Sequence, residues 1–179
     1  MPVELISAIA SVGTFVVIAA TAVAAIIQLR HLRGSNQIVT VTETRETFES
    51  PEFAAARRFV QDDLPAIMQQ PGFSERVARS VPDDELRAAY FVSNFYEHLG
   101  SFVKYGIIDK RLACDLWSGV VLRDWDALLP FTTLRRRSDK SRAFSENFEY
   151  FVVLCQDWDV NHPDGAYPSS VRRMPEWNP

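Results

Sequence analysis

Four polar side chains of the types that carry out acid–base chemistry fall within two turns of an otherwise apolar segment. They are Asn94, Glu97, His98 and Ser101. Residues three and four positions apart share one face of a helix, so Glu97 and His98 can form a patch with Asn94 that transfers protons. No HExxH spacing, second nearby His or nucleophile motif accompanies the patch. A solvated face or a buried, hydrogen-bonded Glu97 explains the pattern more simply. Asn94, Glu97 and His98 are therefore weak catalytic candidates, and the pattern favours a protein that is not an enzyme.

The segment DWDVNHPDG, residues 157–165, begins like a calcium-binding loop, with carboxylate or amide side chains at loop positions one, three and five. The pattern then fails, because His162 stands where the loop needs Gly and Pro168 where it needs a bidentate Glu. No Gly-rich phosphate loop, GxSxG motif or Cys/His cluster is present in the sequence. We expect neither a metal site nor a cofactor.

A basic cluster, LRRRSDKSR, concentrates positive charge toward the C-terminal third of the chain. It contains Arg135, Arg136, Arg137, Lys140 and Arg142. Beside a membrane, each such residue contributes about 1 kcal/mol of attraction to anionic lipid. A solvated helix end is the simpler interpretation, and a protein or nucleic-acid partner is a third. The net charge of −4 gives nucleic acid no support, so no nucleic-acid partner is expected.

The elements that must position these residues begin with a long apolar segment. Residues 5–27, LISAIASVGTFVVIAATAVAAII, are 23 consecutive residues without a charge. As a helix they span about 34 Å, enough to cross a hydrocarbon core of about 30 Å. A signal peptide needs a positively charged start and a shorter apolar core, whereas this chain starts MPVE. A buried core helix of this length would need a far larger protein around it. The segment therefore predicts a transmembrane helix.

The charges on either side of this segment predict its orientation. All 19 Lys and Arg residues follow it, with Arg30 and Arg33 directly behind it, and only Glu4 precedes it. The positive-inside rule then places the N-terminus outside the cell's inner membrane and the residues after Arg33 in the cytoplasm, with Arg30 and Arg33 at the lipid surface. Small residues four apart, such as Ala20 and Ala24, let membrane helices approach closely, so a homo-oligomer is a further hypothesis.

The rest of the chain has the pattern of helices separated by prolines and glycines. Residues 37–50 fit a helix or a strand, and we prefer a helix continuing from the membrane because no partner strand with a turn signal follows. Ser50 and Pro51 predict a helix start. Gly106 predicts a helix end, and Asp109 predicts the cap of the next helix.

Prolines and apolar periods indicate the helices of the C-terminal half. Pro82 predicts a helix start, with acidic residues after it that complement the helix dipole. Trp117 and Trp125 are expected in the cores of two successive helices, the second bent or stopped at Pro130. Apolar residues assigned to those two cores also include Leu112, Leu116, Val120, Val121, Leu128 and Leu129. A clean period over residues 144–158 predicts the last helix.

The two cysteines, Cys114 and Cys155, have neither CxxC spacing nor the company of other metal ligands. Free cysteines usually behave as small buried hydrophobic residues, so a reduced pair in the core is expected in preference to a disulfide. A periplasmic location of the domain would weaken this expectation.

Residues 94–131, NFYEHLGSFVKYGIIDKRLACDLWSGVVLRDWDALLPF, are similar to a bacterial family of uncharacterised proteins, domain of unknown function 4760. The resemblance rests on an aromatic-plus-Glu stretch, a Gly-Ile-Ile-Asp turn, a helix bearing Trp117 and the segment from Trp125 to Pro130. It extends to the aromatic segment ENFEYF, residues 146–151, and an N-terminal membrane helix is common in the family. The resemblance implies a fold and a topology, but it assigns no catalytic residue because the family has no established activity.

These observations predict an all-α protein with one transmembrane helix and a bundle of about five helices. We expect a membrane segment at residues 1–33, a cytoplasmic helical domain at 34–160 and a Pro-rich, mobile tail at 161–179. A non-enzymatic interaction or scaffold module that binds an unknown protein partner is the leading interpretation. A membrane-tethered enzyme using Glu97 and His98, and a regulator that responds to anionic lipid through Arg135 to Arg142, are the alternatives.

Overall fold

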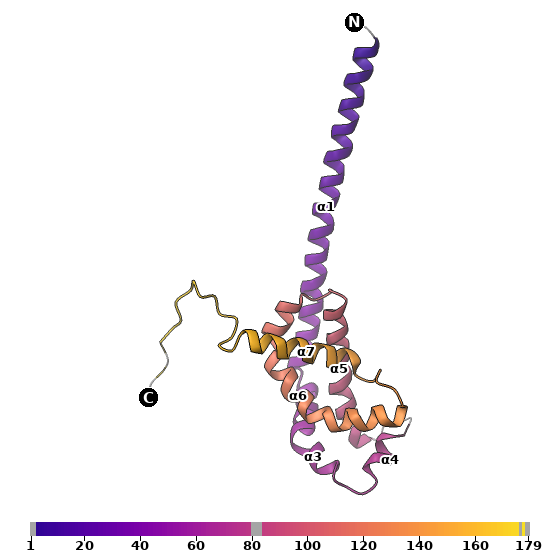
Figure 1. Ribbon diagram of the computed structural model, residues 1–179, viewed down its shortest axis with the longest axis vertical. Coiled ribbons are helices and arrows are strands. Elements are labelled where there is room, and N and C mark those ends of the chain that lie inside the picture. The colour runs from indigo at the N-terminus through magenta and orange to yellow at the C-terminus, as the bar shows by residue number, and fades with distance from the viewer. Residues whose placement is uncertain (1–2, 80–83, 176, 178–179) are drawn as a thin grey trace. The chain divides into compact units, whose positions relative to one another are not determined.

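The computed structural model describes residues 3–79, 84–175 and 177, and within these ranges the chain forms helices and no strands (Figure 1). The elements are α1 (Val3–Glu49), α2 (Pro51–Arg58), the π-helix η1 (Phe59–Asp63), α3 (Leu64–Ile67), α4 (Phe73–Val77), the 3-10 helix η2 (Asp84–Leu86), α5 (Arg87–Lys104), α6 (Lys110–Asp139) and α7 (Glu146–Asn161). The predicted all-α class is confirmed. Pro82, the predicted helix start, lies outside the described residues.

The chain divides into two units, Met1–Thr42 and Glu43–Pro179, with the division inside α1. The first unit contains one segment, Ala10–Leu29, that is long and apolar enough to cross a membrane, with a mean hydropathy of 2.3 and no part of it buried inside the protein. By length and composition this segment fits either a membrane anchor or a signal sequence. The side chains of Arg30 and Arg33, predicted at the lipid surface, lie outside the described residues.

The second unit starts with the last turns of α1, which belong to its aromatic core. The ring of Phe48 lies 5.7 Å from that of Phe53 and 6.1 Å from that of Phe95, measured between centroids. The preferred helical interpretation of residues 37–50 is confirmed for residues 37–49, which belong to α1. Ser50 then caps α2 as predicted, because its Oγ accepts a hydrogen bond from the backbone N–H of Phe53 at 3.1 Å and Pro51 occupies the first helical position.

The turn between α5 and α6 also follows its sequence signals. Gly106 has a φ of +68°, and the N–H groups of Gly106 and Ile107 donate to the carbonyls of Val103 and Phe102, which is the Schellman arrangement. Asp109 caps α6, since its Oδ1 accepts from the backbone N–H groups of Arg111 and Leu112 at 2.9 and 3.1 Å.

The predicted division of residues 110–139 into two helices is wrong. Pro130 lies inside the single 30-residue helix α6 and does not end it. Pro130 is exposed, so the carbonyl group that loses its N–H partner four residues earlier faces water and not the core. Leu112, Leu116 and Leu129, expected in the core, are also exposed, because the buried stripe of the continuous helix runs along another face. Its buried members include Ala113, Trp117, Val121, Asp124, Trp125, Leu128 and Phe131.

Helix α7 packs against both α5 and α6, and aromatic rings fill the space among them. The ring of Phe148 stacks on Tyr96 of α5 at 4.7 Å and meets Trp125 of α6 edge-on at 4.9 Å. After Asn161 the described chain forms turns and coil, including a short loop in which Arg173 lies over the ring of Tyr167. The three-helix contact of α5, α6 and α7 is what positions the polar side chains considered next.

Candidate functional site

Glu97 caps the N-terminus of α7 from the neighbouring helix α5. Its carboxylate accepts hydrogen bonds from the backbone N–H groups of Asn147 and Phe148, at 3.0 and 2.9 Å, and from Asn147 Nδ2 at 2.7 Å. The first residues of a helix have N–H groups without partners inside the helix, and a carboxylate there also complements the helix dipole. Glu97 therefore stabilises the contact between α5 and α7.

The local residue at the cap position of α7 does not perform this task. Ser145 has a φ of +56°, and its side chain makes no capping hydrogen bond to α7. Its hydroxyl lies 2.7 Å from that of Ser93, a buried residue of α5. The backbone N–H groups at the start of α7 thus find their acceptor on α5, and Lys104 of α5 adds a side-chain contact by donating to Asn147 Oδ1 at 3.0 Å.

Gly100 allows the two helices to approach at this cap. A Cβ atom placed on Gly100 would lie 2.0 Å from the carbonyl oxygen of Asn147 and 2.5 Å from its carbonyl carbon. No side chain fits there without moving the backbone of α7. Sequence reasoning missed Gly100, and its only signal was a glycine one turn after Glu97 in a helix with a strong apolar face.

The structure does not assemble the predicted catalytic patch into one site. Asn94 and His98 are exposed, whereas Glu97 is half-buried against α7. Within the part of the chain that the structure describes, no hydrogen bond joins Glu97 to Asn94 or His98. The geometry therefore gives Glu97 a structural contact, and it leaves Asn94 at the edge of a separate groove described below.

A second polar cluster, which sequence reasoning did not find, centres on Asp124. This carboxylate is fully buried in α6 and accepts four hydrogen bonds. Arg57 of α2 donates from Nε at 2.5 Å and from Nη2 at 3.1 Å. Gln61 of η1 donates from Nε2 at 2.6 Å, and Tyr96 of α5 donates from its hydroxyl at 2.7 Å. One carboxylate thus joins four helical elements of the second unit.

The surroundings of Asp124 keep the Tyr96 hydroxyl protonated and place Arg57 and Gln61 beside the carboxylate. Burial, together with the charge of Asp124 and the hydrogen bond to it, raises the pKa of Tyr96 well above its ordinary value, so the hydroxyl remains a donor. Arg57 is half-buried, and its guanidinium also lies over the ring of Phe48 at 5.1 Å. Gln61 reaches the cluster from the π-helix, a rare geometry that often re-aims side chains. The sequence signal for this cluster was a carboxylate on the buried stripe of α6.

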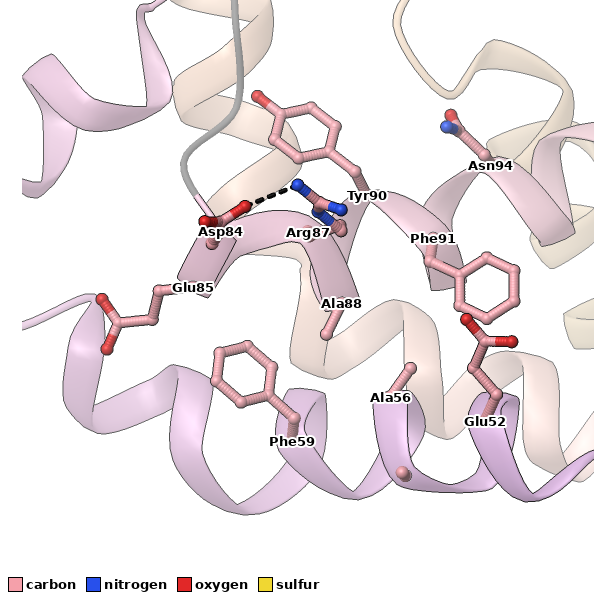
Figure 2. A pocket seen from close by; sticks show the side chains of 11 residues that line it. Glu52, Ala56, Phe59, Asp84, Glu85, Arg87, Ala88, Tyr90, Phe91 and Asn94 are labelled. Atoms are coloured by element: carbon pink, nitrogen blue, oxygen red, sulfur yellow. Dashed lines mark hydrogen bonds and ion pairs between the residues drawn. The ribbon is translucent and has the colours of Figure 1, made fainter.

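An open groove of about 720 Å³ lies between α2 with η1 on one side and η2 with α5 on the other. Figure 2 shows Ala56 and Phe59 facing Ala88 across this groove, with Phe91 farther along α5. Carboxylates of Glu52, Asp84 and Glu85 stand around it; Asp84 pairs with Arg87, and Glu85 pairs with Arg76. We call this surface the α2–α5 groove; it is also lined by Ala55, Tyr90 and Asn94. An apolar floor beside the carboxylate of Glu52 suits apolar side chains that are flanked by positive charge.

The predicted basic cluster divides into two parts with different contacts. Arg135 donates from Nη1 to the carbonyls of Val77 and Arg79, both at 2.9 Å, and so ties α6 to α4. Arg136 donates to the carbonyls of Phe144 and Ser145 and pairs with Glu149 at 2.8 Å. These two arginines hold the fold together.

The remaining members, Arg137, Lys140 and Arg142, are exposed. They line a shallow hollow of about 370 Å³ together with Arg136. Arg142 also approaches Glu149 at 3.6 Å, so part of the positive charge is compensated. Lys140, with a φ of +50°, ends α6, where positive side chains complement the helix dipole. Only these three residues remain able to contact a partner with their full side chains.

Metal ligation finds no support in the described ranges, in which no group of three or more His, Cys, Asp or Glu side chains is placed to hold an ion. The acidic segment at residues 157–165 continues α7 to Asn161 and then turns. Asn161 Nδ2 donates to the carbonyl of Asp157 at 2.6 Å, and the ring of His162 stacks on Trp158. This arrangement is a helix end and not a calcium loop.

Comparison with known proteins gives one match. Residues 15–158 match a family described as Domain of unknown function (DUF4760), and the match covers most of the apolar segment Ala10–Leu29 and the helices from there through most of α7. No curated protein and no solved structure matches the chain. The matched range includes Glu97, Gly100 and Asp124, so the two polar clusters lie inside the family's domain. The chain belongs to the DUF4760 family.

Proposed function

We propose that this chain is a single-pass membrane protein whose helical domain is an interaction module, not an enzyme. One observation carries the proposal: the apolar segment Ala10–Leu29 has no protein covering it. Twenty residues of uncovered apolar helix are far more than a water-soluble surface leaves exposed, and they match the thickness of a bilayer. Lipid is the cover that fits this length and composition.

The polar side chains within this segment support the same environment. The hydroxyls of Ser11, Thr14 and Thr21 each donate to the carbonyl four residues earlier, at 3.0, 2.9 and 2.8 Å. A hydroxyl that is satisfied within its own helix can enter a bilayer without an unpaired donor. α1 also continues to Glu49 without a break, which favours an anchor over a segment that is removed.

The proposed orientation places the second unit in the cytoplasm. It is supported by the distribution of charge, since every Lys and Arg of the chain follows the apolar segment. The span would then be held at its cytoplasmic end by Arg30 and Arg33.

The interaction role is supported by what the polar residues of the domain do. The carboxylates of Glu97 and Asp124 accept hydrogen bonds from backbone N–H groups, a guanidinium, side-chain amides and a phenol of this same chain. The α2–α5 groove, by contrast, presents Ala55, Ala88 and Phe91 to solvent. We propose that this groove binds a segment of a partner protein that carries apolar and basic side chains, because the carboxylate of Glu52 stands beside an apolar floor.

The anchor and its orientation are tested with the full chain in membranes. The protein should stay in the membrane fraction after carbonate extraction, and a variant with Val16→Arg and Val23→Arg should be released from it. A fluorescent reporter at the C-terminus should be active in the cytoplasm, and an alkaline phosphatase reporter there should be inactive. Extraction of the unmodified chain as a soluble protein, or the reverse reporter result, would overturn this part of the proposal.

The groove is tested with a photoreactive amino acid placed at Ala88, and at the exposed Asp115 of α6 as a matched control. The Ala88 probe should crosslink a peptide rich in apolar and basic residues, and Ala55→Arg should abolish the product. The Asp115 probe should not give it. Crosslinks that survive Ala55→Arg, or that join only two copies of this chain, would contradict a heterologous partner in the groove.

A second candidate function rests on the three exposed cations, Arg137, Lys140 and Arg142. They favour contact with anionic lipid, the more so because the proposed anchor would keep them near a membrane. The triple substitution to Gln should lower the binding of the detergent-solubilised chain to phosphatidylserine beads, while Arg172→Gln with Arg173→Gln should not. Unchanged lipid binding of the triple variant would exclude this role.

A further inference from the structure

The two cysteines of the chain meet where α6 packs against α7. Both are buried free thiols, Cys114 in the second turn of α6 and Cys155 in the second half of α7. The groove wall that contains Cys114 also contains Leu154 and Trp158 of α7, the neighbours of Cys155 in sequence and in the helix. Each thiol shifts the pKa of the other, which places the two sulfurs near each other in this packing.

We propose that Cys114 and Cys155 form a reversible disulfide between α6 and α7 when a hydroperoxide enters the groove beside Cys114. The family match assigns no such site. The proposal is also independent of the interaction role proposed above. The two thiols lie on helices that pack against each other and are 41 positions apart in sequence, so a disulfide between them would cross-link α6 to α7. The sequence-based expectation of reduced thiols then describes the resting state.

Access to the pair is provided by a groove of about 350 Å³ in which Cys114 forms part of the wall. Cys114 is only 3% exposed, so a bulky reagent reaches it poorly, whereas hydrogen peroxide is close to water in size. Lys110 and Arg111 line the same groove and can donate hydrogen bonds to the peroxide oxygens. The site therefore favours a small oxidant over a protein disulfide.

Access to the groove gives the thiols unequal roles, because Cys114 lines the groove and Cys155 is fully buried behind it. The interaction with Cys155 also lowers the pKa of Cys114, against the opposing effects of burial, Asp159 and Asp109, and Lys110 lowers it further. The interaction with Cys114, together with burial, raises the pKa of Cys155. Cys114 is thus the thiol that reacts first, and Cys155 is the thiol that resolves the product.

The chemistry balances with one hydroperoxide as the oxidant. The Cys114 thiolate attacks one peroxide oxygen, the O–O bond breaks, and hydroxide leaves and takes up the thiol proton as water. Cys114 is then a sulfenic acid. The sulfur of Cys155 attacks the sulfur of Cys114, the S–O bond breaks, and the hydroxyl leaves with the Cys155 proton as a second water. Two thiols and one peroxide give one disulfide and two waters.

The test treats the full chain in detergent with equimolar hydrogen peroxide and then alkylates it under denaturing conditions. The expected product loses two hydrogens in mass, takes up no alkylating reagent, and yields one peptide pair joined through Cys114 and Cys155. Dithiothreitol should restore both thiols. The oxidised chain should also unfold at a higher temperature than the reduced chain, because the disulfide restricts the unfolded state.

Two single variants test the division of roles. Cys155→Ser leaves Cys114 without its resolving partner, so a dimedone adduct should accumulate at Cys114. Cys114→Ser should react about tenfold more slowly with peroxide than Cys155→Ser, because the remaining thiol is fully buried and does not line the groove. Full alkylation of both cysteines after peroxide treatment, or a disulfide only between two chains, would overturn the proposal. Equal reactivity of the two variants would overturn the assignment of Cys114 as the attacking thiol.

Discussion

Glu97 and Asn147 are 50 positions apart, yet the carboxylate of Glu97 receives both the backbone N–H and the side-chain amide of Asn147. The first turn of α7 is thereby capped by α5 and not by its own preceding residue. The cap and the helix contact are consequently one structure, and weakening either should loosen both.

Replacing Glu97 should measure this cap. Glu97→Ala leaves the N–H groups of Asn147 and Phe148 without their acceptor and should lower the free energy of unfolding by about 1–3 kcal/mol. Glu97→Gln keeps one oxygen acceptor and should cost less. His98→Ala, on the exposed side of the same helix, should stay within about 0.5 kcal/mol of the wild type. Denaturant unfolding of the full chain, followed by circular dichroism, gives all three values, and equal losses for Ala and Gln would argue against the cap.

Gly100 should be intolerant of the smallest possible side chain. Gly100→Ala places a Cβ 2.0 Å from the carbonyl oxygen of Asn147, so α7 must move, and overpacking of this kind typically costs about 1–3 kcal/mol. Gly119→Ala is the matched control, since Gly119 also lies inside a helix and its Cβ would meet nothing within 4 Å. That variant should gain about 0.5–1 kcal/mol from helix propensity alone. If Gly100→Ala and Gly119→Ala shift the melting temperature in the same direction, the close approach of α5 and α7 is contradicted.

The outcome at these positions shows which kinds of information a single sequence contains. Ser50, Gly106 and Asp109 act through hydrogen bonds to residues within four positions, and their roles were predicted correctly. Glu97 and Asp124 act on residues 50 and 67 positions away, which no local period encodes. Sequence reasoning could thus identify Glu97 as an unusual polar residue but could not predict its partner.

The error at Pro130 has a different cause. Proline removes one hydrogen bond from a helix, and that loss is a local penalty of about 3 kcal/mol. In α6 the flanking residues Leu128 and Phe131 are fully buried, and packing on both sides of the proline offsets the penalty. Tertiary contacts therefore decide whether a proline ends a helix, and the sequence on its own does not report them.

Gly106 should be sensitive for a conformational reason and not for lack of space. Its φ is +68°, and no atom lies within 4 Å of the position of an added Cβ. Gly106→Val forces a β-branched residue into the left-handed region, which should cost about 1–3 kcal/mol. Gly106→Asn should cost clearly less, because Asn tolerates this region. Thermal unfolding of the two variants separates a conformational cause from a lack of space. Equal melting temperatures for Gly106→Val and the wild type would show that the positive φ of Gly106 does not limit stability.

Asp124 should be the carboxylate whose loss is most damaging. Asp124→Ala leaves the half-buried Arg57 without its counter-ion and strands the donors of Gln61 and Tyr96, and breaking a buried pair in this way costs about 3–5 kcal/mol. Asp115→Ala, on the exposed face of α6, is the control and should be nearly neutral. A double variant, Arg57→Met with Asp124→Leu, should recover part of the lost stability, because no charge remains buried although the donors of Gln61 and Tyr96 still lack their acceptor. Denaturant unfolding midpoints measure the stability of each variant. A lower midpoint for the double variant than for Asp124→Ala would contradict the network.

Tyr96 should make the fold sensitive to alkali. Burial and the neighbouring Asp124 raise the pKa of Tyr96 in the folded chain above the value of 10.0 that an unperturbed tyrosine has. The unfolded chain therefore releases the phenol proton first, and deprotonation favours unfolding as the pH rises past about 10. Below that pH the contribution of Tyr96 is fully present. At neutral pH, Tyr96→Phe should cost about 1 kcal/mol for its lost hydrogen bond to Asp124. The melting temperatures of wild type and Tyr96→Phe should therefore converge between pH 9 and 11 in matched buffers, whereas a constant difference across that range would show that Tyr96 ionises equally in both states.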